Sequence, residues 1–130
     1  MIVVDASAFL ELLLRTASGL TVERLLLTDV AAAPHLIDAE VLHRIVLFGK
    51  HGVMQRHEVE TAVRELADAP IDRFDHRPLL PRARELSEAI SGYDALYAAL
   101  ADLTGATLVT GDRAFARTAR AQLGLAVADI

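Results

Sequence analysis

The chain begins MIVVDASAFL, residues 1–10, and this stretch decides the fold. Residues 1–4 form a short, β-rich apolar run without alternation, which is typical of a buried strand in a parallel sheet. The run stops at Asp5, and the apolar stripe that begins with Phe9 predicts a helix over residues 6–15. A buried strand followed at once by a helix is how α/β chains are built.

The rest of the chain continues this alternation of strands and helices. Further strands are expected at residues 31–33, 70–74, 106–110 and 125–127. Helices are expected at residues 20–27, 36–50, 58–67 and 93–103, with one ending near residue 90 and a last one running to residue 123. Ser18 and Gly19 are expected to separate the first two helices. The pattern predicts one α/β domain over residues 1–130, with a mainly parallel central sheet and helices on both faces.

Composition narrows the class of protein. The chain has 130 residues, of which 53% are hydrophobic, so it is long enough and apolar enough for one folded domain. Cysteine is absent, which excludes disulfides, thiolate zinc sites and a cysteine nucleophile. No apolar run reaches the roughly 18 residues of a membrane span, and no basic leader precedes the first strand, so a cytoplasmic protein is expected. The net charge of −5 argues against a protein that coats nucleic acid.

Four acidic residues stand where strands end or helices begin. Asp5 directly follows the first expected strand, and Asp112 lies two residues beyond the strand at 106–110. Glu40 and Asp94 lie in the first turns of expected helices. In open parallel sheets, active sites form outside the carboxyl ends of the strands. If the two strands are neighbours, Asp5 and Asp112 face one crevice.

Each acid also has a purely structural interpretation, which is the commoner use of such residues. Asp5 and Asp112 are suited to cap the helices that follow them. Asp94 completes an S-x-x-D pattern typical of a capping box. Glu40 has the spacing of a helical ion pair with Arg44.

The four acids taken together favour a metal site. Four carboxylates in one pocket repel one another, which raises their pKa values and destabilises the fold. A divalent cation removes that cost, and oxygen ligands without cysteine suit Mg²⁺ or Mn²⁺. Such an ion activates a bound water and stabilises charge on a phosphoryl oxygen, so hydrolysis of a phosphodiester is the expected chemistry.

Four segments resemble one known family. MIVVDASA at the start, IDAEVLHR at residues 37–44, SGYDALYAALA at 91–101 and TLVTGDRAFA at 107–116 occur in the order and at about the spacing of PIN-domain ribonucleases of the VapC toxin type. The resemblance covers essentially the whole chain. It implies a PIN-like α/β/α sandwich that acts as an endoribonuclease.

The resemblance also assigns roles to residues. It implies that Mg²⁺, with Mn²⁺ as a substitute, is held by a catalytic quartet of Asp5, Glu40, Asp94 and Asp112. Ser7 and Thr110 match positions where a hydroxyl supports an acid or a metal-bound water. Some members carry a further acid one turn after Asp112, where this chain has Phe115 and Ala116. The site expected here is therefore a four-acid version.

Basic residues near these acids are candidates for contact with RNA phosphates. Arg113 and Arg117 lie one turn apart directly after Asp112, and Arg44 lies one turn after Glu40. The alternative is a solvated helix face that serves only solubility. An acidic protein that binds RNA needs such contacts somewhere, so these arginines are predicted to provide them.

The first half of the chain is more apolar than one sheet face requires. The excess predicts apolar patches that bury against a partner. The resemblance implies two partners: a second copy in a homodimer, and a VapB-like antitoxin whose C-terminal segment lies in a groove between the early helices.

Two other functions compete with the ribonuclease. Haloacid dehalogenases and receiver domains also place an aspartate after the first strand. The former need D-x-D, where this chain has Asp5-Ala6-Ser7, and both need a late lysine, whereas Lys50 is the sole lysine. The second alternative is a non-catalytic PIN-like module that sequesters a protein or RNA. Such a module has no reason to hold four carboxylates together.

Overall fold

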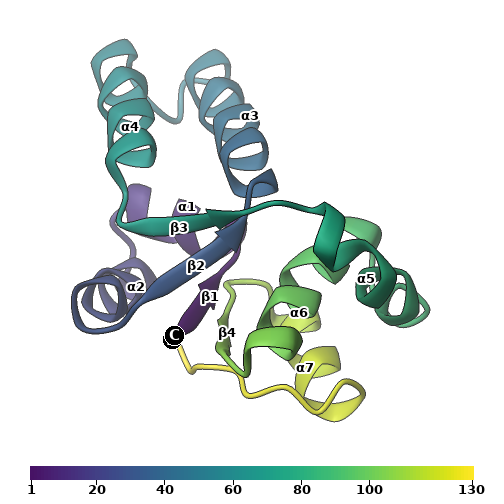
Figure 1. The fold of residues 1–130 in the computed structure, drawn as a ribbon. Coiled ribbons are helices and arrows are strands. Elements are labelled where there is room, and N and C mark those ends of the chain that lie inside the picture. Colours follow the sequence, from purple (N-terminus) through teal and green to yellow (C-terminus); the bar gives the residue numbers. More distant parts are fainter.

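A four-stranded sheet runs through the middle of the molecule in the computed structural model, which describes residues 1–130 (Figure 1). The strands are β1 (Ile2–Val4), β2 (Ala31–Pro34), β3 (Ile71–Phe74) and β4 (Thr107–Val109). Their order across the sheet is β3-β2-β1-β4, and every neighbouring pair is parallel. The predicted α/β fold with a parallel sheet is confirmed.

Seven α-helices surround this sheet. They are α1 (Ala6–Leu13), α2 (Ala17–Thr28), α3 (Leu36–Lys50), α4 (Arg56–Asp68), α5 (Leu80–Leu86), α6 (Gly92–Thr104) and α7 (Arg113–Ala121), and a 3₁₀ turn, η1 (Arg77–Leu79), precedes α5. Figure 1 shows α1 and α2 on one side of the sheet, α5, α6 and α7 on the other, and α3 and α4 side by side beyond its edge. None of these helices is both long enough and apolar enough to span a membrane.

Helix α6 forms the centre of the core. Every residue from 95 to 101 is buried, and the helix contacts β1, β2 and β4. Four of these seven residues are alanines, whose small side chains let a helix approach a sheet closely. Because residues 95–101 are buried, the core fixes the position of the helix and so of its first turn, which carries Asp94.

The order of the strands creates a crevice at β1. The chain passes from β1 to β2 and β3 on one side of the sheet, then returns to place β4 on the other side of β1. Ligands of open α/β sheets bind where the strand order reverses, outside the carboxyl ends of the strands. The adjacency of β1 and β4 is the condition under which Asp5 and Asp112 were expected to face one crevice.

The expected strand at residues 125–127 is wrong. Val127 and Leu108 form a single bridge. In it, the Leu108 N–H donates to the carbonyl of Ala126, and the Ala128 N–H donates to the carbonyl of Leu108. The carbonyl of Val127 accepts instead from the Arg120 side chain, at 3.0 Å. The tail therefore follows β4 for one residue without extending the sheet.

The break expected at Ser18 and Gly19 is also wrong, since both residues lie inside α2. The hydroxyl of Thr16 caps this helix by accepting from the Gly19 N–H at 3.0 Å. A Cβ on Gly19 would lie 2.1 Å from the carbonyl oxygen of Glu11 in α1. Glycine is present because α1 and α2 touch at this point, and it does not mark a turn.

Candidate active site

Asp5 is the most deeply buried acid of the chain and lies at the end of β1. Asp5 is only 4% exposed. Oδ1 accepts from the Ala8 N–H at 2.9 Å and from the Ser7 hydroxyl at 2.7 Å, and Oδ2 accepts from the Thr110 hydroxyl. Asp5 therefore caps α1, as the structural interpretation expected, and its second oxygen is held from β4.

Ser7 and Thr110 link Asp5 to the loop after β4. The Ser7 hydroxyl accepts from the Gly111 N–H at 2.9 Å, and the Thr110 hydroxyl accepts from the Asp112 N–H at 3.0 Å. The two hydroxyl oxygens lie 3.2 Å apart. Two helix-starting loops, after β1 and after β4, are thus joined by one polar network around a buried carboxylate.

Asp112 lies at the exposed rim of this network. Its side chain caps α7 by accepting from the Phe115 N–H at 3.0 Å. The capping interpretation is confirmed for Asp112 as well. Capping uses Oδ1 alone and leaves the other carboxylate oxygen without a protein hydrogen bond.

Glu40 and Asp94 reach the site from two helices. Oε1 of Glu40 accepts from the Tyr97 hydroxyl at 2.8 Å. Glu40 forms no ion pair with Arg44, whose guanidinium lies over the Phe48 ring at 5.3 Å, so the expected helical pairing is wrong. Asp94 lies in the first turn of α6, where its N–H donates to the capping hydroxyl of Ser91 at 3.2 Å.

The pKa values show that the acids act on one another. Burial raises the pKa of Asp5 from 3.8 to about 6, against hydrogen bonds that lower it, and the charge of Asp94 raises it further. Burial and the charge of Asp94 likewise raise the pKa of Glu40. Burial and the charge of Asp112 raise the pKa of Asp94. Burial is the larger cause in each case, and the charge of Asp94 acts on both Asp5 and Glu40.

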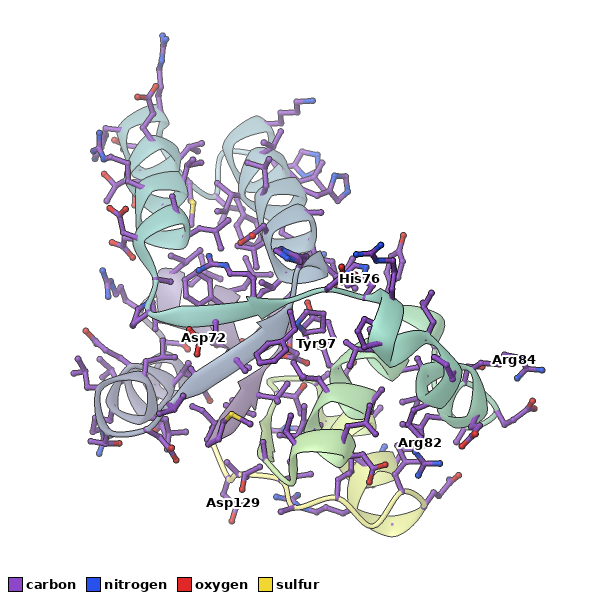
Figure 2. The ribbon with its side chains drawn as sticks, viewed as in Figure 1. Asp72, His76, Arg82, Arg84, Tyr97 and Asp129 are labelled. Carbon is purple, nitrogen blue, oxygen red and sulfur yellow. The ribbon has the colours of Figure 1, made fainter.

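Tyr97 belongs to the site but was given no role from the sequence, although it lies within the SGYDALYAALA segment. Burial and the charge of Glu40 raise its pKa far above the ordinary range, so the hydroxyl keeps its proton and donates. Figure 2 shows Tyr97 in the interior of the molecule, in contrast to Arg84 and Asp129 at its periphery. No local pattern signals the contact, because its partner lies 57 positions away.

The donor set fits a hard divalent cation by its chemistry. Every candidate ligand is a carboxylate or hydroxyl oxygen, which suits Mg²⁺ or Mn²⁺. Burial, and to a smaller extent neighbouring acids, raise the pKa values of Asp5, Glu40 and Asp94. No three acidic or histidine side chains converge closely enough to make a preformed metal-ligating group. The assignment of the quartet to a metal stays a prediction.

Two hollows adjoin residues of the site, and each is lined by one of the predicted arginines. Arg113 lines a hollow of about 360 Å³ next to Thr110 and Gly111. Arg44 lines a second hollow, of about 330 Å³, together with Ser7 and Glu40.

The remaining arginines of α7 differ from each other. Arg117 is exposed and forms no ion pair. Arg120 is paired with Asp129 at 2.8 Å and so is occupied by the C-terminal tail. Of the α7 arginines, Arg113 alone lies in a hollow and free of an ion pair.

Two further residues hold the start of α3, the helix that carries Glu40. Nε2 of His76 accepts from the Leu36 N–H at 2.9 Å, which satisfies a donor at the helix N-terminus. The guanidinium of Arg73 donates to Asp38 at 3.0 Å and to backbone carbonyls at the end of α4. Neither contact could be found in the sequence, since the partners are 40 and 35 positions apart.

The chain matches a known family over most of its length. The model of the PIN domain matches residues 2–121. Ribonuclease VapC3 of Mycobacterium tuberculosis is 36% identical over 117 residues, which cover 89% of this chain and 85% of the relative. Ribonuclease VapC12 of the same organism is 34% identical over 118 residues, covering 91% and 92% of the two chains.

Solved structures share the fold. PAE2754 from Pyrobaculum aerophilum superimposes with a TM-score of 0.71 at 22% identity, covering 97% of this chain and 81% of that one. VapBC2 from Rickettsia felis, solved bound to a DNA fragment from its promoter, gives a TM-score of 0.65 at 16% identity, with 98% of each chain covered. With the family match and these relatives, the chain belongs to the PIN-domain family, in its VapC group.

Proposed function

We propose that this protein is a divalent-metal-dependent endoribonuclease and the toxin of a VapBC-type toxin–antitoxin pair. The observation that carries the proposal is the placement of the acids at the reversal point of a parallel sheet, where one hydrogen-bond network joins buried Asp5 to the loop of Asp112 and the charge of Asp94 acts on Asp5 and Glu40. The relatives at 34% to 36% identity are named ribonucleases, which supports RNA as the substrate.

The acids would hold the ion and the surrounding residues would hold the acids. Asp5, Glu40, Asp94 and Asp112 would hold Mg²⁺, or Mn²⁺ in its place. The ion supplies an activated water and stabilises charge on the phosphoryl group. Ser7 and Thr110 donate to Asp5 and so keep its carboxylate oriented toward the crevice side of β1 and β4. With a pKa of about 6, Asp5 is ionised at neutral pH and available as a ligand.

The flanking hollows provide places for the RNA backbone. Arg113 and Arg44 would each contact a phosphate from its own hollow, and exposed Arg117 would extend the contact along α7. Phosphate contacts position a strand without reading its sequence. The target sequence is therefore expected to depend on other contacts.

An antitoxin would bind to the face of α1 opposite the hollow that Arg44 lines. A hollow of about 330 Å³ lies between α1, α2 and the end of α4, with Phe9, Leu12 and Leu26 in its lining. At its rim, Leu27 is 78% exposed, which is unusual for a large apolar side chain. A VapB-like C-terminal segment would cover these residues and bring a basic side chain toward the acids.

A second copy of the chain is the other expected partner. Large apolar side chains on the α5–α6 side are open to solvent, among them Leu80 and Leu103, at 53% and 57% exposed. A homodimer through this side would bury them.

Cleavage of total RNA by the purified chain tests the proposal. We expect discrete fragments with Mg²⁺ or Mn²⁺, and none with EDTA or with Asp94→Asn. Loss of the Asp94 carboxylate should lower the rate of RNA cleavage at least about 100-fold. Asp72→Asn is the matched control, because Asp72 is exposed on the edge strand β3 (Figure 2) and forms no ion pair.

The same assay distinguishes the competing function. A folded protein that binds RNA without cutting it, in every metal condition, would overturn the nuclease and favour the sequestering module. Fragments that persist with EDTA would overturn the metal mechanism.

A further inference from the structure

We propose that Tyr97 is a positioning residue of the acidic site, whose hydroxyl holds the Glu40 carboxylate in the orientation that binds a divalent cation. The proposal rests on the metal-dependent function proposed above. It adds a residue outside the quartet and a direct spectroscopic signal for metal binding.

The contact between the two residues is specific and buried. The Tyr97 hydroxyl, on α6, donates to Oε1 of Glu40, on α3, at 2.8 Å. Tyr97 is 1% exposed, so its hydroxyl has no access to bulk water. A buried hydroxyl requires a hydrogen-bond partner, and in this structure the partner is a site acid.

The arrangement leaves half of the carboxylate free. Only Oε1 of Glu40 accepts a hydrogen bond from a protein side chain, and Oε2 accepts none. A ligand carboxylate that is anchored through one oxygen presents the other to an ion in a defined direction, and such anchoring partners strengthen metal binding. Phenylalanine would fill the same core volume, so packing alone does not require the hydroxyl.

Helix α6 brings two parts of the site together. Asp94 and Tyr97 are three positions apart, which puts them on the same face of the helix. The charges of both Glu40 and Asp5 act on the Tyr97 hydroxyl. One buried helix thus contributes an acid and also orients another acid that comes from α3.

The chain contains its own control. It has two tyrosines and no tryptophan. Tyr93, one turn before Tyr97 on α6, is 63% exposed and its hydroxyl forms no hydrogen bond. In Tyr93→Phe, therefore, the near-ultraviolet absorption of tyrosine and its fluorescence report Tyr97 alone.

The first measurement compares metal affinity by titration calorimetry with Mn²⁺ and Mg²⁺. Tyr97→Phe should bind about 10- to 100-fold more weakly than the unmodified chain, as loss of such an anchoring partner typically does. Tyr93→Phe should bind with unchanged affinity. RNA cleavage by Tyr97→Phe should need a higher metal concentration for half-maximal rate and should recover most of its rate at saturation, because the four acids remain.

The second measurement needs no change at Tyr97. Metal added to Tyr93→Phe should shift the tyrosine spectrum, because a cation at Glu40 withdraws charge from the oxygen that the hydroxyl faces. Glu40→Gln in the same background should remove the shift.

The outcomes separate this proposal from the proposed function. Equal metal affinity of Tyr97→Phe and Tyr93→Phe, or metal binding with no spectral shift, would overturn the role of Tyr97 and leave the nuclease in place. An unmodified chain that binds neither metal would overturn the proposed function, and the role of Tyr97 with it.

Discussion

The four acids of the site fall into two pairs that the fold holds by different means. Asp5 and Asp112 follow strands, and each accepts from a backbone N–H three positions later in its own helix. Glu40 and Asp94 come from helices. Glu40 is held by a hydroxyl 57 positions away, and the start of its helix is held by His76 and Arg73 from beyond β2.

We call Asp5 and Asp112 the local half of the site, because each caps the helix that follows it. Glu40 and Asp94 form the tertiary half, because their positions depend on how distant segments pack. The strand-end pair takes its capping geometry from the turn that begins the next helix, and the Thr110 hydroxyl adds one contact to Asp5 between the adjacent strands β1 and β4. The helix-borne pair depends on how the core places α3 and α6 so that Tyr97 reaches Glu40. Changes to the local half should therefore act mainly through charge, and changes to the tertiary half through packing and hydrogen bonds.

The largest stability effect is expected in the local half, at Asp5, and it depends on pH. Its pKa rises from 3.8 to about 6 on folding, so between these values the folded chain keeps a proton that the unfolded chain has released. The free energy of unfolding of the metal-free protein should therefore fall as the pH rises through this window. Two pKa units correspond to about 3 kcal/mol, which is an upper limit for this residue.

Asp5→Asn isolates this contribution. In EDTA at pH 7, urea denaturation should show the variant to be more stable than the unmodified chain by up to about 3 kcal/mol, with little difference at pH 4. Asp112→Asn should change stability little, because Asp112 is exposed and asparagine caps helices equally well. Equal stability of Asp5→Asn and the unmodified chain at pH 7 would mean that the burial of Asp5 carries no cost. Saturating Mg²⁺ should reverse the order of the two proteins.

The same division decides what the sequence could predict. The strands β1 and β4 depend on neighbours within a few positions and were predicted correctly. Capping by Asp5 and Asp112, which was the structural alternative for these acids, depends on equally local signals and is confirmed. Helix α3 was predicted with its observed bounds, because its apolar spacing and final Gly52 are local signals. The sandwich could be predicted from the alternation of elements, whereas the adjacency of β1 and β4 could only be stated as a condition.

The tertiary half could not be predicted for the same physical reason. Local spacing suggested that Glu40 pairs with Arg44, whereas the fold gives it the buried Tyr97 as a partner. A surface ion pair contributes little free energy, so a spacing rule for it is easily overridden by a buried hydrogen bond. Gly19 shows the same effect. A glycine is required there because α1 and α2 touch, and the residue does not mark a turn.

A smaller effect is expected at Arg73, in the tertiary half. Its side chain is 17% exposed and its guanidinium donates to Asp38 and to the carbonyls of Leu66, Ala69 and Ile71. Arg73→Leu leaves these acceptors without their donor and should lower the free energy of unfolding by about 2 kcal/mol.

The control for Arg73 is Arg84→Leu. The side chain of Arg84 is 73% exposed and pairs on the surface with Glu88 (Figure 2). Its replacement should cost less than about 0.5 kcal/mol. If both variants lose the same stability in urea denaturation, Arg73 does not hold α3 and α4 together.

The smallest effect is expected at His76, which lies beside the start of α3 (Figure 2) and accepts from the Leu36 N–H. His76→Ala removes the acceptor from the helix N-terminus, where His35 provides no side-chain cap, and should cost about 1 kcal/mol in urea denaturation. His43→Ala, an exposed position on the same helix, should cost almost nothing. Because the helix start lies one turn before Glu40, His76→Ala should also weaken metal binding slightly, while the pH dependence that Asp5 imposes should stay unchanged. A variant that altered the pH dependence instead would show that the two halves of the site are coupled through the core.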